Sequence, residues 1–403
     1  MSENAEGGWP AVDYEQRHWE PAIEVRDSFG PHRASSGPYR AVVPPRIAAL
    51  DIRLSPETMA LSADATAELI RFDTEFGAQD SPVGALLLRA EGTASAAIEG
   101  VTGNAQAIAL AELEESHEPI ANEIAGNARA IELALFLCGS LSEAGQASED
   151  AVVQVQRALM ASTRPERRGR WRDQQVWIGG GALGPHRASF VPPHQSRLPE
   201  LMNDLMQFVR RRDLPALAQI AIAHAQYETV HPFLEVNGRT GRALMQAMLR
   251  RGDVTRSIAV PVSAGLLQDT AAYFDALTKY RAGKIDPIVE VFSRASFTAV
   301  ANSRELIDDL AAVRQSWAAR STSRQGSGAR RLIELLERQP VINSRSAIEY
   351  LGVTAPNAQL AIDRLVADDI LTQVGSTRRN RVWAAREIID VLDAFAERAR
   401  RRR

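Results

Sequence analysis

Twelve consecutive residues bring together a base, an acid, an amide and two guanidiniums. They run from His231 to Arg242 and read His-Pro-Phe-Leu-Glu-Val-Asn-Gly-Arg-Thr-Gly-Arg. An imidazole can take a proton, a carboxylate is a hard oxygen ligand for magnesium, and arginine forms planar forks on phosphate oxygens. The types and spacing of these residues therefore predict a phosphate site.

The segment before this stretch predicts a helix that ends where the chemistry begins. Residues 214–230 form an apolar, alanine-rich run with helical character. His231 precedes Pro232, and a proline pushes the backbone of the residue before it out of the helical region. We therefore expect the imidazole of His231 to lie at the end of a helix.

The segment after the stretch predicts a second helix. Asn237 is a good N-cap residue, and residues 239–250 continue in a helical pattern with one apolar side. The free amides in the first turn of a helix bind anions with the help of the helix dipole. Arg239 and Arg242 are three residues apart and share one face of this helix.

This stretch resembles the signature of the Fic family of nucleotidyltransferases, His-Pro-Phe-x-(Asp/Glu)-Gly-Asn-Gly-Arg-x-x-Arg. Eleven of the twelve positions accord with it. Four residues upstream also look like that family's approach to the motif, namely His224, Gln226, Tyr227 and Glu228. The resemblance implies a protein adenylyltransferase, in which a hydroxyl attacks the α-phosphate of ATP and AMP remains on a target protein.

The resemblance also assigns roles to single residues. It implies that His231 is the general base that takes the proton from a target Ser, Thr or Tyr hydroxyl. Glu235 would hold Mg2+, and ATP would be the co-substrate. The implied nucleotide-binding residues are Asn237, Gly238, Arg239, Gly241 and Arg242, with Tyr273 in the adenine pocket.

Val236 departs from the pattern, because the family has a glycine at this position. A β-branched residue adopts positive φ only at a cost. Every other chemical residue of the stretch is retained, so we expect φ of Val236 to be negative and the loop to accommodate the side chain.

A helix that starts at Pro82 and runs to about Ile98 leads into a second motif. Glu99 lies in its last turn, where a negative charge opposes the helix dipole, so we expect a cationic partner. The segment from Ser95 to Gly100 resembles the (Ser/Thr)-x-x-x-Glu-(Gly/Asn) motif of the Fic family's inhibitory helix. This resemblance implies that Ser95 and Glu99 are inhibitory, and that Glu99 pairs with Arg242 at the place of the ATP γ-phosphate. In some relatives the same carboxylate instead orients a water that removes AMP.

The region between residues 164 and 191 predicts a basic face followed by a β-hairpin. Five arginines lie in residues 164–172, and we interpret this charged run as solvated. Residues 174–178 and 188–191 are β-like and flank a glycine-rich turn. This hairpin resembles the Fic family's flap, which would hold a target segment by strand addition through Val176, Trp177, Ile178 and Gly179.

Composition bounds the class of protein. With 403 residues, 45% of them hydrophobic, the chain can bury a large core and divide into two or three domains. Its net charge of −3 argues against a general coat for nucleic acid or membranes. The single cysteine, Cys138, excludes an intramolecular disulfide and fits a reducing cytoplasm. The N-terminus has no apolar core and we identify no run long enough to span a bilayer, so we expect a cytoplasmic protein without membrane contact.

The C-terminal part resembles a winged helix. Residues 321–328 form a polar Gly/Ser-rich linker. After it come a helical segment at 329–338, a segment at 344–350, a helical segment at about 354–368, and β-like segments at 370–374 and 381–384. Residues 321–403 carry a net charge of +5, which leaves about −8 on the remainder. Three arginines near the predicted wing could contact DNA phosphates, namely Arg378, Arg379 and Arg381, although a role in protein docking or dimerisation is an equal alternative.

We therefore expect a mainly α protein with a Fic-type helical core, a β-hairpin flap and a C-terminal winged-helix domain. The expected domains are an N-terminal arm (1–37), an N-terminal helical region with the inhibitory motif (38–120), the Fic catalytic core (121–320), the linker (321–328) and the winged-helix domain with a basic tail (329–403).

The expected function is that of an autoinhibited protein adenylyltransferase with ATP and an unidentified target protein as partners. One alternative is a DNA-binding winged-helix regulator whose Fic site is weakened by Val236. The other is a hydrolase that removes AMP with Glu99. A homodimer is compatible with the resemblance.

Overall fold

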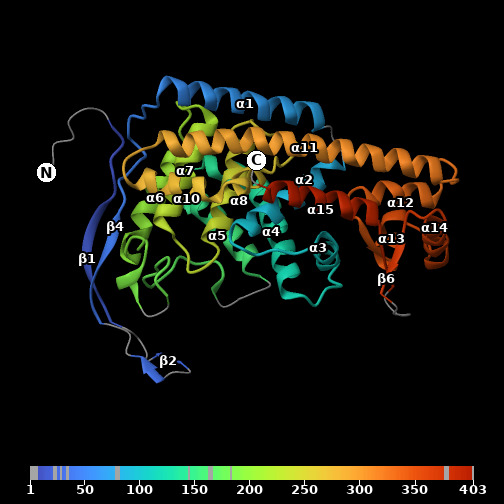
Figure 1. The fold of residues 1–403 in the computed structure, drawn as a ribbon, viewed down its shortest axis with the longest axis horizontal. Helices are drawn as coiled ribbons and strands as arrows, with labels where there is room; N and C mark the ends of the chain where they lie inside the picture. Colours follow the sequence, from blue (N-terminus) through green and yellow to red (C-terminus); the bar gives the residue numbers. More distant parts are fainter. Residues whose placement is uncertain are drawn as a thin grey trace.

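The computed structural model of the protein describes residues 8–20, 25–27, 30–32, 36–77, 82–143, 146–161, 167–181, 184–375 and 381–401. Helices dominate, and the fold is the mainly α arrangement that the sequence predicts (Figure 1). The helices are α1 (Pro56–Phe76), α2 (Val83–Ile98), α3 (Ala105–Glu112), α4 (Pro119–Phe136), α5 (Gln146–Leu159), α6 (Leu198–Val209), α7 (Ala216–Val230), α8 (Asn237–Arg251), α9 (Val262–Gln268), α10 (Thr270–Arg281), α11 (Asp286–Arg320), α12 (Gly328–Leu336), α13 (Ser344–Leu351), α14 (Ala355–Ala367) and α15 (Arg386–Arg400), with short 3-10 helices η1 (Leu137–Ser142), η3 (Pro185–Arg187) and η4 (Gln195–Arg197). The strands are β1 (Asp13–Trp19), β2 (Val25–Asp27), β3 (Gly30–His32), β4 (Gly37–Val43), β5 (Val341–Asn343), β6 (Thr372–Val374) and β7 (Val382–Ala384).

Local signals set the ends of the predicted helices. At the start of α1 the Ser55 hydroxyl accepts a hydrogen bond from the amide of Thr58 at 3.2 Å, and a proline occupies the first turn. At the end of α2, Gly100 has φ +80°, and the amide of Val101 bonds the carbonyl of Ala96 at 3.1 Å. Ser55 thus caps the start of α1, and Gly100 closes the end of α2 in a left-handed conformation.

The helix that leads into the phosphate-site stretch is buried on every face. α7 packs against α1, α6, α8, α10 and α11, and its residues from Leu217 to Val230 are all buried. An apolar helix without a polar face belongs in the interior of a protein. Because the core surrounds α7, its C-terminal end holds His231 in one place.

The helix that carries the inhibitory motif is fastened to two neighbours. The buried carboxylate of Glu91 on α2 accepts hydrogen bonds from the amide and the hydroxyl of Ser263 on α9, at 2.9 and 2.7 Å. On the opposite side, the Asn127 amide of α4 donates to the carbonyl of Gly92 at 2.6 Å. These buried polar contacts fix α2, and with it the position of Glu99.

Three helices and a small sheet form a C-terminal module, which comprises residues 328–384. α12, α13 and α14 pack together beside an antiparallel sheet of order β5-β7-β6. This element order agrees with the sequence prediction, except that β5 was not predicted. The identification of the module as a winged helix stays a prediction.

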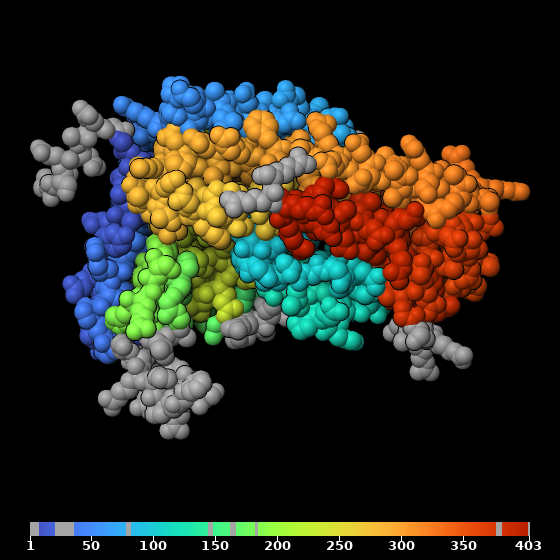
Figure 2. Space-filling view, in the orientation of Figure 1, coloured from blue at the N-terminus to red at the C-terminus, as the bar shows by residue number. Residues whose placement is uncertain are grey.

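The last helix returns from the module to the centre of the molecule. α15 packs against α11, α9, α2 and α3, and Figures 1 and 2 show it in red, running back from the C-terminal module below the orange α11. Glu387 at its start accepts a hydrogen bond from the Trp317 indole at 2.6 Å, and the carboxylate of Asp393 accepts one from the amide of Ala105 at 2.9 Å. The segment that we predicted only as part of a basic tail is therefore a packed helix.

The N-terminal segment that we predicted as an arm contains a paired strand. β1 and β4 form an antiparallel ladder from Asp13 opposite Val43 to Trp19 opposite Gly37. The Trp19 ring contacts the ring of Trp177 with centroids 5.1 Å apart. Because the two strands pair across residue 37, the expected boundary there falls inside one structural unit.

One helical stretch corrects the expectation that no run could span a bilayer. Pro119–Ser142 is long and apolar enough by length and composition, with a hydropathy of 1.3, and half of its window is buried inside the protein. α4, which makes up most of this stretch, packs against α2, α3, α5 and α8. A core helix of a globular protein meets the same criterion, so the stretch is weak evidence for a membrane span.

Candidate active site

The loop between α7 and α8 is closed by its own backbone and by one amide side chain. His231 has φ 52° and ψ 62°, outside the right-handed helical region as predicted, and its amide donates to the carbonyl of Tyr227 at 2.9 Å. The side chain of Asn237 accepts from the amide of Phe233 at 2.8 Å and donates to the carbonyl of the same residue at 2.9 Å. Asn237 is thus the first residue of α8 and closes the loop, which corrects our prediction that it is the N-cap.

Val236 occupies the N-cap position in a left-handed conformation. Its φ is 59° and its ψ 27°, so the expectation of a negative φ is wrong. The carbonyl of Val236 accepts hydrogen bonds from the amide and the hydroxyl of Thr240, at 3.0 and 2.8 Å. These bonds, together with the Asn237 ring closure, require the turn at Val236 whatever its side chain, so the β-branched residue is strained.

Replacing Val236 with glycine is expected to raise the free energy of unfolding by about 1 kcal/mol. A non-glycine residue in this region costs about 1–3 kcal/mol, and the added freedom of glycine in the unfolded chain returns about 0.5–1 kcal/mol. Thermal and urea unfolding measure the change. Val236→Ala, which retains a Cβ, should gain less, and a loss of stability in Val236→Gly would show that the side chain's packing outweighs its strain.

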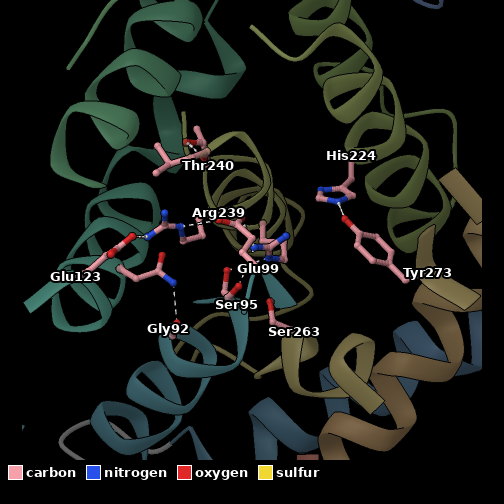
Figure 3. Close-up of polar contacts among 12 residues, drawn as sticks. Gly92, Ser95, Glu99, Glu123, His224, Arg239, Thr240, Ser263 and Tyr273 are labelled. Atoms are coloured by element: carbon pink, nitrogen blue, oxygen red, sulfur yellow. Dashed lines mark hydrogen bonds and ion pairs between the residues drawn. The ribbon is translucent and has the colours of Figure 1, made fainter. Parts of the chain in front are cut away.

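The carboxylate of Glu99 joins both arginines of the loop. Its Oε1 lies 2.8 Å from Nη2 of Arg242, and its Oε2 lies 2.9 Å from Nε of Arg239 (Figure 3). Ser95 adds two bonds, because its hydroxyl and its carbonyl each accept from the Arg242 guanidinium at 2.8 Å. The structure therefore brings together Ser95, Glu99, Arg239 and Arg242, and the cation expected beside Glu99 is present.

Glycine at position 238 lets the carboxylate approach the first turn of α8. A Cβ on Gly238 would lie 2.5 Å from Oε1 of Glu99 and 2.8 Å from Nη1 of Arg242. Glu99 consequently lies against the N-terminus of α8, where free amides and the helix dipole favour an anion. A phosphate that used the same amides and guanidiniums would have to displace it.

A second glycine sets the close crossing of α7 and α8. A Cβ on Gly241 would lie 2.8 Å from the Tyr227 ring and 3.0 Å from Oε1 of Glu228. The Glu228 carboxyl is buried, and its Oε1 has no hydrogen-bond partner among the described residues. Burial raises the pKa of Glu228 to about 7, while the Arg242 guanidinium opposes this rise. The sequence indicated Glu228 only through the family resemblance.

His231 is half-buried at the end of α7. Burial, reinforced by the Arg172 guanidinium, lowers the pKa of His231 to about 4. The imidazole is therefore neutral at pH 7 and able to accept a proton.

Arg172 corrects our interpretation of the basic run as a solvated face. Its side chain is buried, its Nε donates to the carbonyl of His231 at 2.8 Å, and its other nitrogens donate to the carbonyls of Gln174 and Pro193. Arg172 thereby links the catalytic loop to the predicted flap. The neighbouring Trp171, whose ring lies 4.8 Å from that of Phe233, was the signal in the sequence that this part of the run packs inward.

Glu235 is the residue predicted to hold magnesium. Its Oε1 accepts from Nη1 of Arg167 at 2.6 Å, and its side chain is 30% exposed. Within the part of the chain that the structure describes, no group of three or more His, Cys, Asp or Glu side chains could hold a metal. A single carboxylate still fits Mg2+, which commonly takes one or two carboxylates and completes its shell with phosphate oxygens and water.

Tyr273 lies in the interior on α10. Its hydroxyl is 2.7 Å from Nε2 of His224, and both side chains are buried. Burial and the Arg242 guanidinium lower the pKa of His224 to about 3. In this structure the Tyr273 hydroxyl is thus engaged inside the protein, and its predicted place in an adenine pocket stays a prediction.

The predicted flap is shorter than a two-stranded hairpin. Ile178 and Phe190 form one isolated antiparallel bridge, with hydrogen bonds of 2.9 and 3.2 Å between their backbones. Gly179 turns with φ +77°, and the side chain of Ile178 is 42% exposed. The expected extended runs do meet, but the ladder ends after one bridge, because residues on either side bond to Arg172 and to β4 instead.

The arginines predicted to contact DNA are described only in part. Arg378 and Arg379 lie outside the described residues. Arg381 is half-buried, donates to Oε1 of Gln359 at 2.9 Å and lies 5.2 Å from the Trp383 ring centroid. Contact of this module with DNA stays a prediction.

The fold and the site together define a helical protein in which a carboxylate of the same chain pairs with two arginines in the first turns of α8. The sequence model of the Fic/DOC family matches residues 146–249, a segment that includes α7 and the loop that follows it. A Fic family protein from Desulfovibrio desulfuricans G20 has a similar fold, with a TM-score of 0.50 and 19% identity over 83% of this chain and 97% of that chain.

Two curated relatives match the central part of the chain. The protein adenylyltransferase Fic of Nematostella vectensis is 27% identical over 150 residues, which are 36% of this chain and 32% of that protein. The protein adenylyltransferase fic-1 of Caenorhabditis elegans is 26% identical over 179 residues, which are 43% of this chain and 32% of that protein. The matched part is thus about a third of the length of these relatives.

Proposed function

We propose that this protein moves AMP from ATP to a Ser, Thr or Tyr hydroxyl of a target protein, and that Glu99 represses the reaction in cis. The proposal is carried by the contact of the Glu99 carboxylate with Arg242 and Arg239, at 2.8 and 2.9 Å. Guanidiniums beside a helix N-terminus suit phosphate oxygens, and a carboxylate among them competes with such a ligand. The names of the curated relatives support transfer of AMP.

The proposed reaction begins when the phosphates of ATP replace Glu99 on Arg239 and Arg242. The neutral imidazole of His231 accepts the proton of the target hydroxyl. The hydroxyl oxygen then bonds to the α-phosphorus while the bond from that phosphorus to the bridging oxygen breaks, so AMP stays on the target and pyrophosphate leaves. Glu235 would hold Mg2+, which neutralises phosphate charge when it is bound.

The target segment would pair with the flap residues Val176, Trp177, Ile178 and Gly179. The exposure of Ile178 and the end of the ladder after a single bridge support this proposal, because backbone groups near an exposed strand edge accept an added strand. Pairing of this kind forms hydrogen bonds with the main chain of the target and depends less on its side chains.

Glu99→Gly is expected to raise AMP transfer about tenfold or more, since each charge-assisted bond that it removes is worth about 1.5–3 kcal/mol. The purified protein is incubated with radiolabelled ATP, Mg2+ and a cell lysate, and mass spectrometry identifies peptides that carry AMP. Glu114→Gly is the matched control, because Glu114 is exposed and already has φ 61°. Absence of labelling of the lysate and of the protein itself would contradict the proposal, and AMP removal that needs Glu99 would favour the hydrolase alternative.

The remaining expectations stay predictions. They are contact of the C-terminal module with DNA, a homodimer and a cytoplasmic location. Salt-sensitive duplex binding that is lost when Arg378, Arg379 and Arg381 are changed together would support the regulator alternative.

A further inference from the structure

Arg239 is held by two carboxylates that come from different helices. Nε of Arg239 lies 2.9 Å from Glu99, beyond the end of α2, and its Nη1 lies 2.7 Å from Oε1 of Glu123 on α4. Figure 3 shows Glu123 reaching Arg239 from one side while Glu99 lies on the other. The Arg239 side chain is only 7% exposed, and that of Glu123 is 22% exposed, so both ends of this ion pair are shielded from water.

The two contacts differ in which arginines they hold. Glu99 bridges Arg239 and Arg242, whereas the ion pair of Glu123 is with Arg239 alone. The four side chains form a balanced set of two cations and two anions. Loss of Glu99 alone would remove the carboxylate from Arg242, which keeps its bonds to Ser95, but would leave Arg239 paired with Glu123.

Glu123 is positioned by contacts that do not involve the Glu99 side chain. One turn further along α4, the Asn127 amide donates to the carbonyl of Gly92 at 2.6 Å, and a Cβ on Gly92 would lie 3.0 Å from the amide of Ala128. Residues four apart on a helix share one face, so the face that carries Glu123 is the face that packs against α2. The carboxylate of Glu123 therefore stays beside Arg239 when the Glu99 side chain is removed.

We infer that Glu123 is a second inhibitory carboxylate, which competes with the phosphates of a nucleotide for Arg239. The inference rests on the proposed function, because it concerns nucleotide binding at the same site. It follows that displacement of Glu99 gives only partial release, and that full affinity for a triphosphate requires both carboxylates to leave the arginines.

Isothermal titration with ATP and Mg2+ tests this inference in four proteins: the unaltered chain, Glu99→Gly, Glu123→Gln and the double variant. The double variant is expected to bind about tenfold more tightly than Glu99→Gly, the effect of one partly buried charge-assisted bond. Glu123→Gln alone should gain less, because Glu99 still holds both arginines. Glu132→Gln is the matched control, since Glu132 is exposed on the same helix and should leave affinity unchanged.

The same titration with inorganic tripolyphosphate separates the two proposals. Tighter binding of tripolyphosphate by the double variant than by Glu99→Gly supports the role of Glu123 even if ATP fails to bind, in which case the proposed function fails. Equal affinity of the two variants for both ligands overturns the role of Glu123 and leaves the proposed function standing. A weaker affinity in the double variant also overturns it, because Glu123 would then orient Arg239 for phosphate. Failure of every variant to bind either anion, with unfolding temperatures unchanged, overturns both.

Discussion

Replacing His231 with alanine in the Glu99→Gly protein is expected to lower AMP transfer by about a thousandfold, within the range of a general base. The imidazole is suited to this role because burial and the Arg172 guanidinium keep its pKa at about 4, so it is neutral at pH 7. The backbone of His231 is fixed by its hydrogen bonds to Tyr227 and Arg172, so its ring is held at the start of the loop, directly after α7. Transfer is measured as the rate of incorporation of labelled AMP.

Nucleotide affinity and the unfolding temperature distinguish a lost base from a damaged site. Both should be nearly unchanged in Glu99→Gly/His231→Ala, because the side chain of His231 makes no contact with Arg239 or Arg242. His186→Ala in the same background is the matched control, since His186 is exposed on η3. A fall of less than about tenfold would mean that another group or a water takes the proton.

The parts of the site that could be predicted from the sequence are those that lie close together along the chain. Arg239 and Arg242 share a helix face because they are three residues apart, and His231 ends a helix because a proline follows it. For Glu99 the dipole argument predicted only that a cation lies beside it, and the resemblance of residues 95–100 to the Fic inhibitory motif implied that this cation is Arg242. Local spacing and helix-end electrostatics therefore predicted the features that lie within one segment, whereas the family resemblance implied the contact between distant segments.

The residues that were missed act through contacts between distant segments. Nothing in the sequence around Glu123 marks it, because its partner Arg239 lies on another helix 116 residues away. Arg172 belongs to a run whose composition favours a solvated face, and only its packing against the catalytic loop reveals a buried role. Tertiary contacts of this kind override what composition predicts.

Val236 and α15 show two further limits of sequence reasoning. For Val236 the preference of a β-branched residue for negative φ was outweighed by the hydrogen bonds that close the loop, a cost that the rest of the fold bears. In α15 the apolar residues Ile388, Phe395 and Ala399 recur at helical spacing, but the arginines at its end suggested a basic tail. The periodic signal was present there, and the charge pattern obscured it.

Acidification is expected to destabilise the protein through the buried His224 and the half-buried His231. His224 and His231 have pKa values of about 3 and about 4 in the folded protein, against 6.5 in an unfolded chain. Their folded forms stay neutral while the unfolded chain binds protons, so their stabilising contribution is complete above pH 6.5 and is lost as the pH falls toward 4. Between pH 6.5 and 4.5 each histidine accounts for a loss of about 2 kcal/mol in the free energy of unfolding.

Protonation of Glu228 opposes the loss of stability at acid pH, and this difference in sign allows a test. Its pKa is about 7 in the folded protein against 4.5 in the unfolded chain, so its protonation stabilises the fold below pH 4.5, and this contribution disappears as the pH rises through 7. Urea unfolding between pH 7.5 and 4.5 measures how the free energy of unfolding falls as the pH is lowered. Compared with the unaltered protein, this fall should be shallower in His224→Gln and steeper in Glu228→Gln. If His224→Gln leaves the slope unchanged, His224 is protonated in the folded state and its burial beside Tyr273 does not exclude the proton. The opposite changes in slope of the two variants are the decisive comparison. A general loss of stability would lower the free energy of unfolding at every pH without changing its pH dependence in opposite directions.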